Sequence, residues 1–305
     1  MQTNTIGFQQ TVSKVGFALT VLFALTQLLQ VGFSVVLQLA APDFLSAPYG
    51  VWVLSYAPLY LIAVPIFVWM LSRVENTLPA REKVRLGVKR GWTVFFISVA
   101  ALYIFNIVSV CITMGIGLLK GSEVINPIMN VQASSGILYN FLFGVLVAPI
   151  GEELLFRGLL YKKLGGYGDK AFILVSALAF AVFHGNLSQI FYAFALGAIF
   201  AYVMAKTGNI LYSMLLHIII NAYGMVIAPA LMENTVALGI LAILMIAGTV
   251  TGIVLFIRTI RKKAIELEPG VYPLPEHAAR AAVCNLGMGA YLLFGVGIIV
   301  LVTLL

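Results

Sequence analysis

The chain has 305 residues and a formal net charge of +7, and 62% of its residues are hydrophobic whereas only 10% are charged. A soluble domain carries roughly 45–50% apolar and about 25% charged residues, so this composition excludes a soluble enzyme, a disordered chain and a nucleic-acid-binding domain. The chain must therefore use lipid as its solvent, and a positive charge is typical of Lys and Arg gathered in the cytoplasmic loops of a membrane protein.

Nine apolar runs, of about the length that a membrane-spanning helix needs, follow one another along the chain. The first is too long for the h-region of a signal peptide, about 7–15 residues, so we expect it to be a span. The fifth and sixth are short and nearly continuous. We expect an all-α, polytopic integral membrane protein with about 8–9 transmembrane helices in a single membrane domain over residues 1–305. The runs are roughly Val15–Ala40, Val51–Leu71, Gly91–Leu119, Gly136–Leu160, Ala171–Leu187, Gln189–Ala205, Ile210–Ala228, Val236–Ile257 and Val283–Leu305.

Topology follows from the distribution of the basic residues. If the N-terminus is inside and all nine runs cross, sixteen of the eighteen Lys and Arg residues lie in inner segments, and only Lys120 lies outside. Arg157 is the eighteenth and lies within the fourth run. Since cytoplasmic loops collect Lys and Arg, this division predicts a cytoplasmic N-terminus. The inner residues are Lys14, Arg73, Arg81, Lys83, Arg85, Lys89, Arg90, Lys162, Lys163, Lys170, Lys206, Arg258, Arg261, Lys262, Lys263 and Arg280.

Ionisable side chains are rare within the runs and fall into three blocks. A charged group at the centre of a membrane helix costs about 2.5–3.5 kcal/mol on insertion scales, so such residues need a compensating role. The blocks are Glu152, Glu153 and Arg157 in the fourth run, Phe180 and His184 in the fifth, and His217 and Asn221 in the seventh.

Helical spacing assigns different roles within these blocks. Glu153 and Arg157 are four residues apart with the acid first, which is the favoured order on one helix face, so we expect a structural ion pair. Glu152 points about 100° away around the helix and has no local counter-charge, so it is the better candidate for a general base. His217 and Asn221 also share a face and are expected to point into one cavity.

The three blocks lie at comparable depths in their runs. At 1.5 Å per residue, Glu152 and His217 lie on the order of 10–12 Å below the inner surface, and His184 lies nearer 20 Å, a difference that helix tilt can close. A single intramembrane His or Asn often just bonds a neighbouring helix. Three polar blocks at similar depth, with almost nothing else polar around them, favour one water-accessible site.

The ordered set Glu-Glu-x-x-x-Arg, Phe-x-x-x-His and His-x-x-x-Asn on these runs resembles the CAAX protease and bacteriocin-processing family of intramembrane endopeptidases, also called Abi or type II CAAX prenyl endopeptidases. The resemblance covers residues 137–225, the expected catalytic core; each motif alone is weak, and the ordered set is specific. It implies a conical cavity that opens to the cytoplasm. It also implies that Glu152 and His184 activate a water molecule and that His217 and Asn221 stabilise the oxyanion.

A zinc-dependent form of the same hydrolysis stays open as an alternative. Glu152, His184 and His217 are the donors of a possible His₂Glu zinc site. The chain has no His-Glu-x-x-His sequence, the usual carrier of such a site, and Asn221 is a poor zinc ligand. We therefore expect glutamate-dependent hydrolysis without a cofactor, with zinc as the second possibility.

The expected function is an intramembrane endopeptidase that cuts a peptide or a membrane-anchored protein, as in CAAX-like processing, bacteriocin maturation or self-immunity. Membrane lipids are the other expected partners, and nucleic acid is not one. The compact loops favour a prokaryotic plasma membrane.

One alternative is a non-proteolytic scaffold or immunity protein that keeps the motifs for helix packing, although a scaffold has no need of all four candidate catalytic residues. A proton- or ion-coupled transporter is a further alternative, but the outer half of the runs is nearly empty of ionisable groups.

Overall fold

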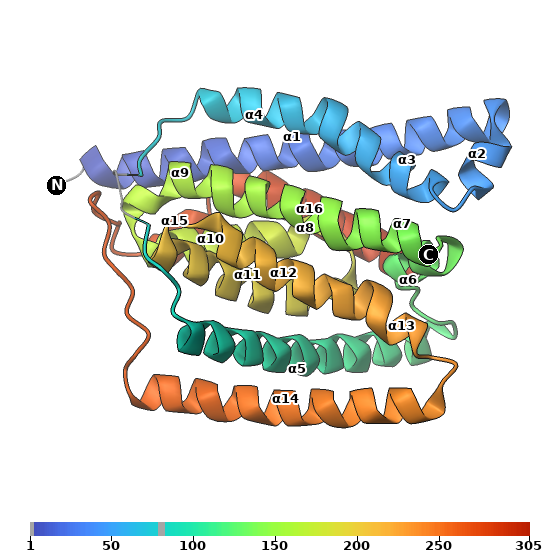
Figure 1. Cartoon of the computed structure of the whole chain (residues 1–305). Helices are drawn as coiled ribbons and strands as arrows, with labels where there is room; N and C mark the ends of the chain where they lie inside the picture. The colour runs from blue at the N-terminus through green and yellow to red at the C-terminus, as the bar shows by residue number, and fades with distance from the viewer. Residues whose placement is uncertain (1–2, 79–82) are drawn as a thin grey trace.

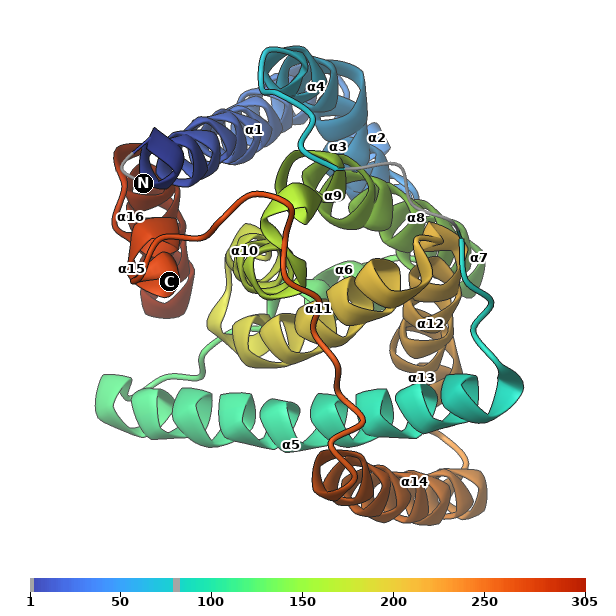
Figure 2. The ribbon, with the colours of Figure 1, turned by 90° about the vertical axis from the view of Figure 1, so that its left-hand side faces the viewer.

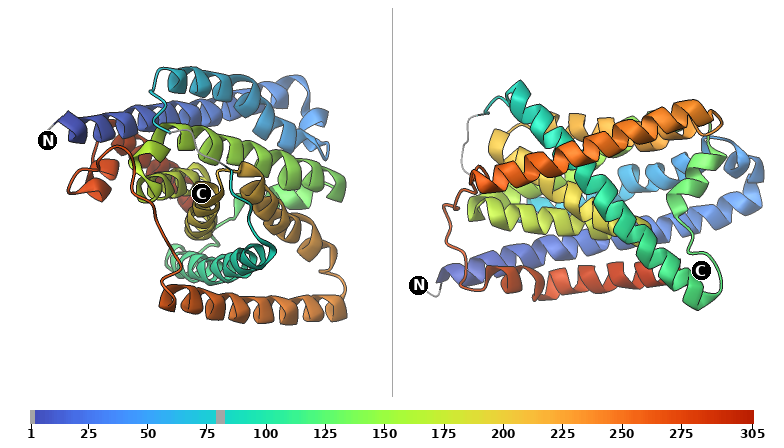
Figure 3. Two further views of the ribbon diagram at one scale, coloured as in Figure 1. Left: turned by 60° about the vertical axis from the view of Figure 1, so that its left-hand side comes forward. Right: turned by 90° about the horizontal axis from the view of Figure 1, so that it is seen from below.

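The computed structural model describes residues 3–78 and 83–305, with the side chains of the first range described from Gly7 onward. Within these ranges the chain is built from helices and has no β-strand. The long helices pack into one bundle, with α5 inclined to its neighbours (Figures 1 and 3), and the expected all-α membrane architecture is confirmed. Of the basic residues counted above, Arg81 lies outside the described ranges.

The N-terminal part of the chain forms the helices that flank the central bundle. Between α3 and α4 the helix continues through one π-helical stretch, η1. The elements are α1 (Thr3–Ala40), α2 (Pro42–Ser46), α3 (Gly50–Pro58), η1 (Leu59–Ala63), α4 (Val64–Ser72), α5 (Val88–Lys120) and α6 (Pro127–Ser134).

The central part carries the three polar blocks and is helical almost throughout. Its first helix contains two π-helical stretches, η2 and η3, on either side of Glu152 and Glu153. The elements are α7 (Ile137–Tyr139), η2 (Asn140–Val147), α8 (Ala148–Glu153), η3 (Leu154–Leu159), α9 (Leu160–Leu164), η4 (Gly165–Tyr167), α10 (Asp169–Phe183), α11 (Leu187–Thr207), α12 (Ile210–Ala222), η5 (Tyr223–Ile227) and α13 (Ala228–Ala230). The chain closes with α14 (Thr235–Arg261), α15 (Ala278–Val283) and α16 (Leu286–Leu304).

Eight helical stretches of the described residues are long and apolar enough to cross a membrane. They correspond to eight of the nine predicted runs, and the exception is the fifth run, which forms the 15-residue helix α10. At 1.5 Å per residue α10 is roughly 22 Å long, less than the hydrocarbon thickness of about 30 Å. α10 nevertheless runs from the end of the bundle where the N-terminus lies toward the other end, and the chain returns through α11 (Figure 1). The two termini of the chain lie at opposite ends. Along the fifth run the chain therefore turns back into α11 after a helix that is shorter than the hydrocarbon layer.

Close packing at glycines joins the first and last helices. α1 and α16 are parallel, and a Cβ added at Gly16 would lie 2.3 Å from the Met288 backbone nitrogen. A Cβ at Gly287 would lie 1.8 Å from the Ser13 carbonyl oxygen. Small residues permit this backbone approach, which is a usual means of helix association in lipid. This pair packs on one side of the motif-bearing helices (Figure 2).

The other side of the bundle is covered by α5 and then by α14. α5 packs against both α11 and α14, and α14 crosses it obliquely (Figure 3, right). Gly252 lies at this crossing, since a Cβ there would come within 2.0 Å of the Phe96 carbonyl oxygen. Much of α14 is apolar and exposed, for example Ile243 at 68% and Ile246 at 65%, as expected for a helix that faces lipid.

The described segments predicted to be on the inner side gather at one end of the bundle, where the N-terminus lies (Figures 1 and 2). The Thr77 N–H donates to the Lys162 carbonyl at 2.9 Å, and the Lys206 ammonium bridges Asp169 at 3.1 Å and Glu268 at 3.2 Å. We call this the basic end, comprising the N-terminus and residues 73–78, 83–90, 162–170, 206–209 and 258–285. The opposite end carries the C-terminus, α2 and α6 and is called the α6 end.

Candidate active site

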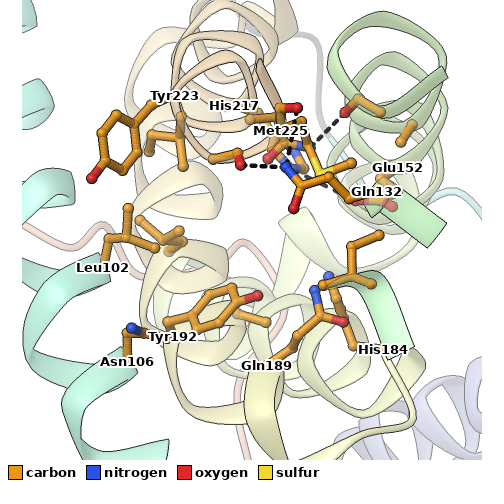
Figure 4. A pocket seen from close by; sticks show the side chains of 18 of the residues that line it. Leu102, Asn106, Gln132, Glu152, His184, Gln189, Tyr192, His217, Tyr223 and Met225 are labelled. Carbon is orange, nitrogen blue, oxygen red and sulfur yellow. Dashed lines mark hydrogen bonds and ion pairs between the residues drawn. The ribbon is translucent and has the colours of Figure 1, made fainter. Parts of the chain in front are cut away.

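The three polar blocks meet at a cavity of about 500 Å³ in the middle of the bundle. Glu152 comes from α8, His184 from the C-terminal end of α10, and His217 and Asn221 from α12. Figure 4 shows Glu152, His184 and His217 around one space, with Gln132, Gln189 and Tyr192 on its walls. The four predicted residues, up to 69 positions apart in the sequence, therefore share one cavity, which is within the usual size range of ligand pockets.

The two adjacent carboxylates differ in their surroundings. Glu153 is fully buried, and its Oε1 accepts a hydrogen bond from Arg157 Nη1 at 2.9 Å. Arg157 is also fully buried, and its Nη2 donates to the Gly197 carbonyl at 3.2 Å. The side chain of Glu152 is 19% exposed and lines the cavity. Only Glu152 of the two acids therefore faces the space in which a substrate and water would lie.

His217 joins the two carboxylates. Its Nδ1 lies 3.1 Å from Glu153 Oε1, and its Nε2 lies 3.7 Å from Glu152 Oε2. Because a carboxylate accepts, the Nδ1–H donates to Glu153, which leaves Nε2 directed toward Glu152. Glu153 therefore has two roles: it pairs with Arg157, and it orients the imidazole of His217. Sequence reasoning missed this contact, because nothing in the spacing of Glu153 and Arg157 reveals a partner on α12.

His184 is positioned by the turn that ends α10. Its Nδ1 lies 2.8 Å from the Phe180 carbonyl oxygen and must donate to it, so its Nε2 is free to accept a proton. Gly185 follows with a φ of 63°, a left-handed conformation that glycine adopts without strain. The Asn186 side chain then caps α11 by accepting from the Gln189 N–H at 3.0 Å. This turn presents the free nitrogen of His184 to the cavity.

Phe180 packs between the polar residues of the site. Its ring centroid is 4.7 Å from that of His184 and 5.7 Å from that of His217, both edge-on. The guanidinium carbon of Arg157 lies 4.2 Å from the centre of the same ring. The phenylalanine of the second motif therefore keeps the two imidazoles apart and covers the buried cation.

Asn221 lies one helical turn beyond His217, as the i, i+4 spacing predicts. Its side-chain Nδ2 donates to the Gly144 carbonyl at 2.9 Å, which ties α12 to η2. An amide NH₂ has two donor hydrogens, so the second remains for a group in the cavity. The side chain thus has both a packing contact and a donor that lines the site.

The donor arrangement bears on the zinc alternative. Across the described residues, no group of three or more His, Cys, Asp or Glu side chains is arranged to hold a metal ion. His217 uses its Nδ1 on Glu153 and turns Nε2 toward Glu152 at 3.7 Å, a hydrogen-bonding arrangement rather than three donors directed at one point.

Several cavity residues were not among those expected from the sequence. Four are carboxamides, and their only sequence signal is a polar amide within or beside an apolar run. Others are aromatic and are indistinguishable in sequence from lipid-facing or core residues. They are Asn106, Asn126, Gln132, Gln189, Trp52, Tyr56 and Tyr192.

The cavity lies toward the α6 end of the bundle. Its lining includes Asn126 and, on α6, Ile128, Met129 and Gln132, whereas none of its lining residues belongs to the basic end among the described segments. A cytoplasmic N-terminus and a cavity open to the cytoplasm were both expected. The N-terminus and α6 lie at opposite ends of the bundle (Figure 1), and both expectations stay predictions.

Comparisons with known proteins agree with the motifs. Residues 134–223 match the family described as type II CAAX prenyl endopeptidase Rce1-like. The chain is 25% identical over 174 residues to UPF0177 protein YxdF of Lactococcus lactis subsp. lactis (strain IL1403), covering 54% of this chain and 90% of that protein. It is 27% identical over 183 residues to "Putative membrane peptidase YdiL" of Bacillus subtilis (strain 168), covering 57% of this chain and 70% of that protein. No solved structure gives a significant match. The resemblance to the CAAX protease and bacteriocin-processing family is thereby confirmed.

Proposed function

We propose that this protein is an intramembrane endopeptidase in which Glu152 acts as the general base. The observation that carries the proposal is the convergence of Glu152, His184, His217 and Asn221 on one cavity within a membrane bundle. The match of residues 134–223 to a prenyl endopeptidase family supports a protease. The substrate is then a peptide or a membrane-anchored protein.

Water activation would use the two groups that have a free acceptor. Glu152 has a carboxylate at the cavity, and the neutral ring of His184, whose Nδ1–H donates to the Phe180 carbonyl, has its acceptor at Nε2. A water held by both loses a proton to Glu152 as its oxygen attacks the peptide carbonyl carbon. The same carboxyl then gives that proton to the leaving amine, which completes hydrolysis with no net gain of protons by the enzyme.

The oxyanion of the tetrahedral intermediate would be stabilised from α12. Asn221 donates through its second amide hydrogen. His217 donates through Nε2 if its ring has taken up a second proton from water before the substrate binds; the Glu153 carboxylate at Nδ1 then balances that charge while Glu152 holds the proton taken from the attacking water. Donors fixed in a water-poor cavity stabilise such an oxyanion more than the same donors in water.

Internal cleavage fits the charge of the cavity better than removal of a terminal residue. Among the described cavity residues, Glu152 is accompanied by no Lys or Arg. A free C-terminal carboxylate would therefore enter without a Lys or Arg side chain to pair with. Amide side chains such as Asn106 and Gln189 offer both donors and acceptors, which suits an uncharged stretch of peptide backbone.

The test is a comparison of protein C-termini in membranes from cells that carry the wild-type protein, Glu152→Gln or Glu233→Gln. Glu233 is an exposed acid between α13 and α14 and serves as the matched control. We expect cleavage products with wild type and Glu233→Gln that are absent with Glu152→Gln. Identical sets of C-termini in all three would contradict the protease and favour the scaffold alternative.

A further inference from the structure

We propose that a second cavity, at the basic end of the bundle, binds a membrane phospholipid, with the phosphodiester on Arg90 and one acyl chain between α5, α11 and α14. This cavity has a volume of about 420 Å³, which is within the usual size range of ligand pockets. Among the described residues it has no lining residue in common with the catalytic cavity. The proposal therefore does not depend on the protease activity.

The second cavity arises from the oblique crossing of α14 over α5. The two helices are closest at Gly252, where a Cβ would lie 2.0 Å from the Phe96 carbonyl oxygen. From this crossing α14 continues to Arg261, a distance of roughly 13 Å at 1.5 Å per residue. α11 also packs against α5, and residues of all three helices line the cavity. A wedge between α11 and α14 therefore stays open at the basic end.

The segment 264–268 closes one side of this wedge. It follows α14 and passes α5 and α11 on its way toward α10 (Figure 2). The Asp169 N–H donates to the Glu268 carbonyl at 3.0 Å, and the Glu268 N–H donates to the Asp169 carboxylate at 3.0 Å. The Lys206 ammonium bridges both carboxylates, at 3.1 and 3.2 Å. The segment is thus held in place, and it turns apolar side chains into the cavity; these are Ala264, Ile265 and Leu267.

Two polar groups of the lining have no protein partner within the described ranges. Lys206 is neutralised by Asp169 and Glu268. The guanidinium of Arg90 is exposed and makes no ion pair with a described residue, and the Tyr202 hydroxyl makes no hydrogen bond with one. The threonine hydroxyls of the lining already donate to carbonyls of their own helices at 2.7–2.8 Å; they belong to Thr93, Thr207 and Thr259. One cation and one phenol are therefore left for a ligand.

The chemistry and depth of these groups indicate a phospholipid. A guanidinium binds phosphate oxygens through two N–H groups, and no Asp or Glu belongs to the described lining. Arg90 is the third residue of α5 and Lys206 lies in the last turn of α11, so both lie at helix ends, where lipid headgroups lie. Ile97 and Ile199 line the cavity seven residues further along these helices, roughly 10 Å deeper. A charged end at the membrane surface and an apolar interior match a phosphodiester followed by an acyl chain.

Native mass spectrometry of the purified full chain in detergent, freed of lipid and then titrated with defined lipids, tests the proposal. The lipids are phosphatidylglycerol with oleoyl chains, diacylglycerol with the same chains, and oleate. Arg90→Gln removes the cation, and its control is Arg258→Gln, which removes an exposed Arg of α14 outside the lining. Ile97→Trp fills the interior, and its control is Ile104→Trp on the same helix, where the side chain is 41% exposed and does not line the cavity.

We expect phosphatidylglycerol to bind wild type and both controls alike, and diacylglycerol to bind none of them. Arg90→Gln should weaken phosphatidylglycerol binding about tenfold or more, since a charge-assisted contact is lost, and Ile97→Trp should weaken it by filling the space of the chain. Equal binding to Arg90→Gln and Arg258→Gln would overturn the proposal, as would diacylglycerol bound as tightly as phosphatidylglycerol. Preferential binding of oleate would overturn it in favour of a carboxylate ligand. If Ile97→Trp does not fold, the two Arg variants decide the question by themselves.

Discussion

Truncation of Arg157 is the sharpest probe of what holds the active site together. The side chain is fully buried, donates to Glu153 Oε1 at 2.9 Å and to the Gly197 carbonyl at 3.2 Å, and stacks on Phe180. Arg157→Ala removes all three contacts. It leaves the Glu153 carboxylate, also fully buried, without the cation that balances it.

The size of the effect follows from that uncompensated charge. Breaking a buried ion pair by removing one partner costs about 3–5 kcal/mol, and a desolvated cation–π contact contributes about 2 kcal/mol. The two overlap, because both belong to one side chain, and do not add in full. We therefore expect Arg157→Ala to lower the free energy of unfolding by about 3–5 kcal/mol, a large share of the roughly 5–15 kcal/mol of a typical protein.

Two further variants separate loss of charge balance from loss of volume. Glu153→Gln with Arg157→Met removes both charges and keeps the volume, and it should recover most of the stability, since a buried pair replaced as a whole is often neutral or better. The same double variant should be inactive if the Glu153 carboxylate is needed to orient His217. Arg157→Lys keeps the charge but loses the two-pronged donor geometry, so its stability should be intermediate.

Unfolding of the purified proteins in detergent micelles by increasing SDS, followed by tryptophan fluorescence, measures these differences directly. Glu152→Gln is the reference, because its side chain lies at the cavity and is 19% exposed. If Arg157→Ala unfolds at the same SDS concentration as Glu152→Gln, the structural role of the pair is refuted. A double variant no more stable than Arg157→Ala would refute the reasoning about charge.

The remaining predictions concern catalysis. Glu152→Gln should keep near-normal stability and lower kcat by about 10²–10⁴ on a peptide substrate identified from the C-terminal comparison, since the general base is lost; a retained kcat would exclude Glu152 as the base. Asn221→Ala should lower kcat by about 10²–10³ with little change in KM if its free N–H donates to the oxyanion. If Asn221 only ties α12 to Gly144, kcat should hold and stability should fall by roughly 0.6 kcal/mol. Exhaustive dialysis of the enzyme against a strong chelator should leave its activity unchanged; loss of activity that returns on adding zinc would instead support the metal-dependent alternative.

Composition and local spacing are enough to predict the class of this protein and the residues of its candidate site. Apolar runs of about 20 residues predict membrane helices, because in lipid each backbone polar group must be satisfied within its own helix. The i, i+4 spacing predicts that Glu153 meets Arg157 and that His217 and Asn221 share a face. The excess of Lys and Arg in alternate connections also predicts that these segments gather at one end. All of these depend on residues that are near in sequence or on simple counts.

Contacts between helices were decided only by the tertiary structure. The hydrogen bond from His217 to Glu153, the carboxamides that line the cavity and the hydrogen bond from Gln132 on α6 to η5 all join residues far apart in the chain. Which faces of the helices meet depends on how side-chain volumes and glycines fit together along the whole bundle. The periodicity within one helix does not predict which face of a neighbouring helix it contacts. The position of the cavity follows from the same packing, since its lining combines residues of α3, α5, α6, α8, α11 and α12.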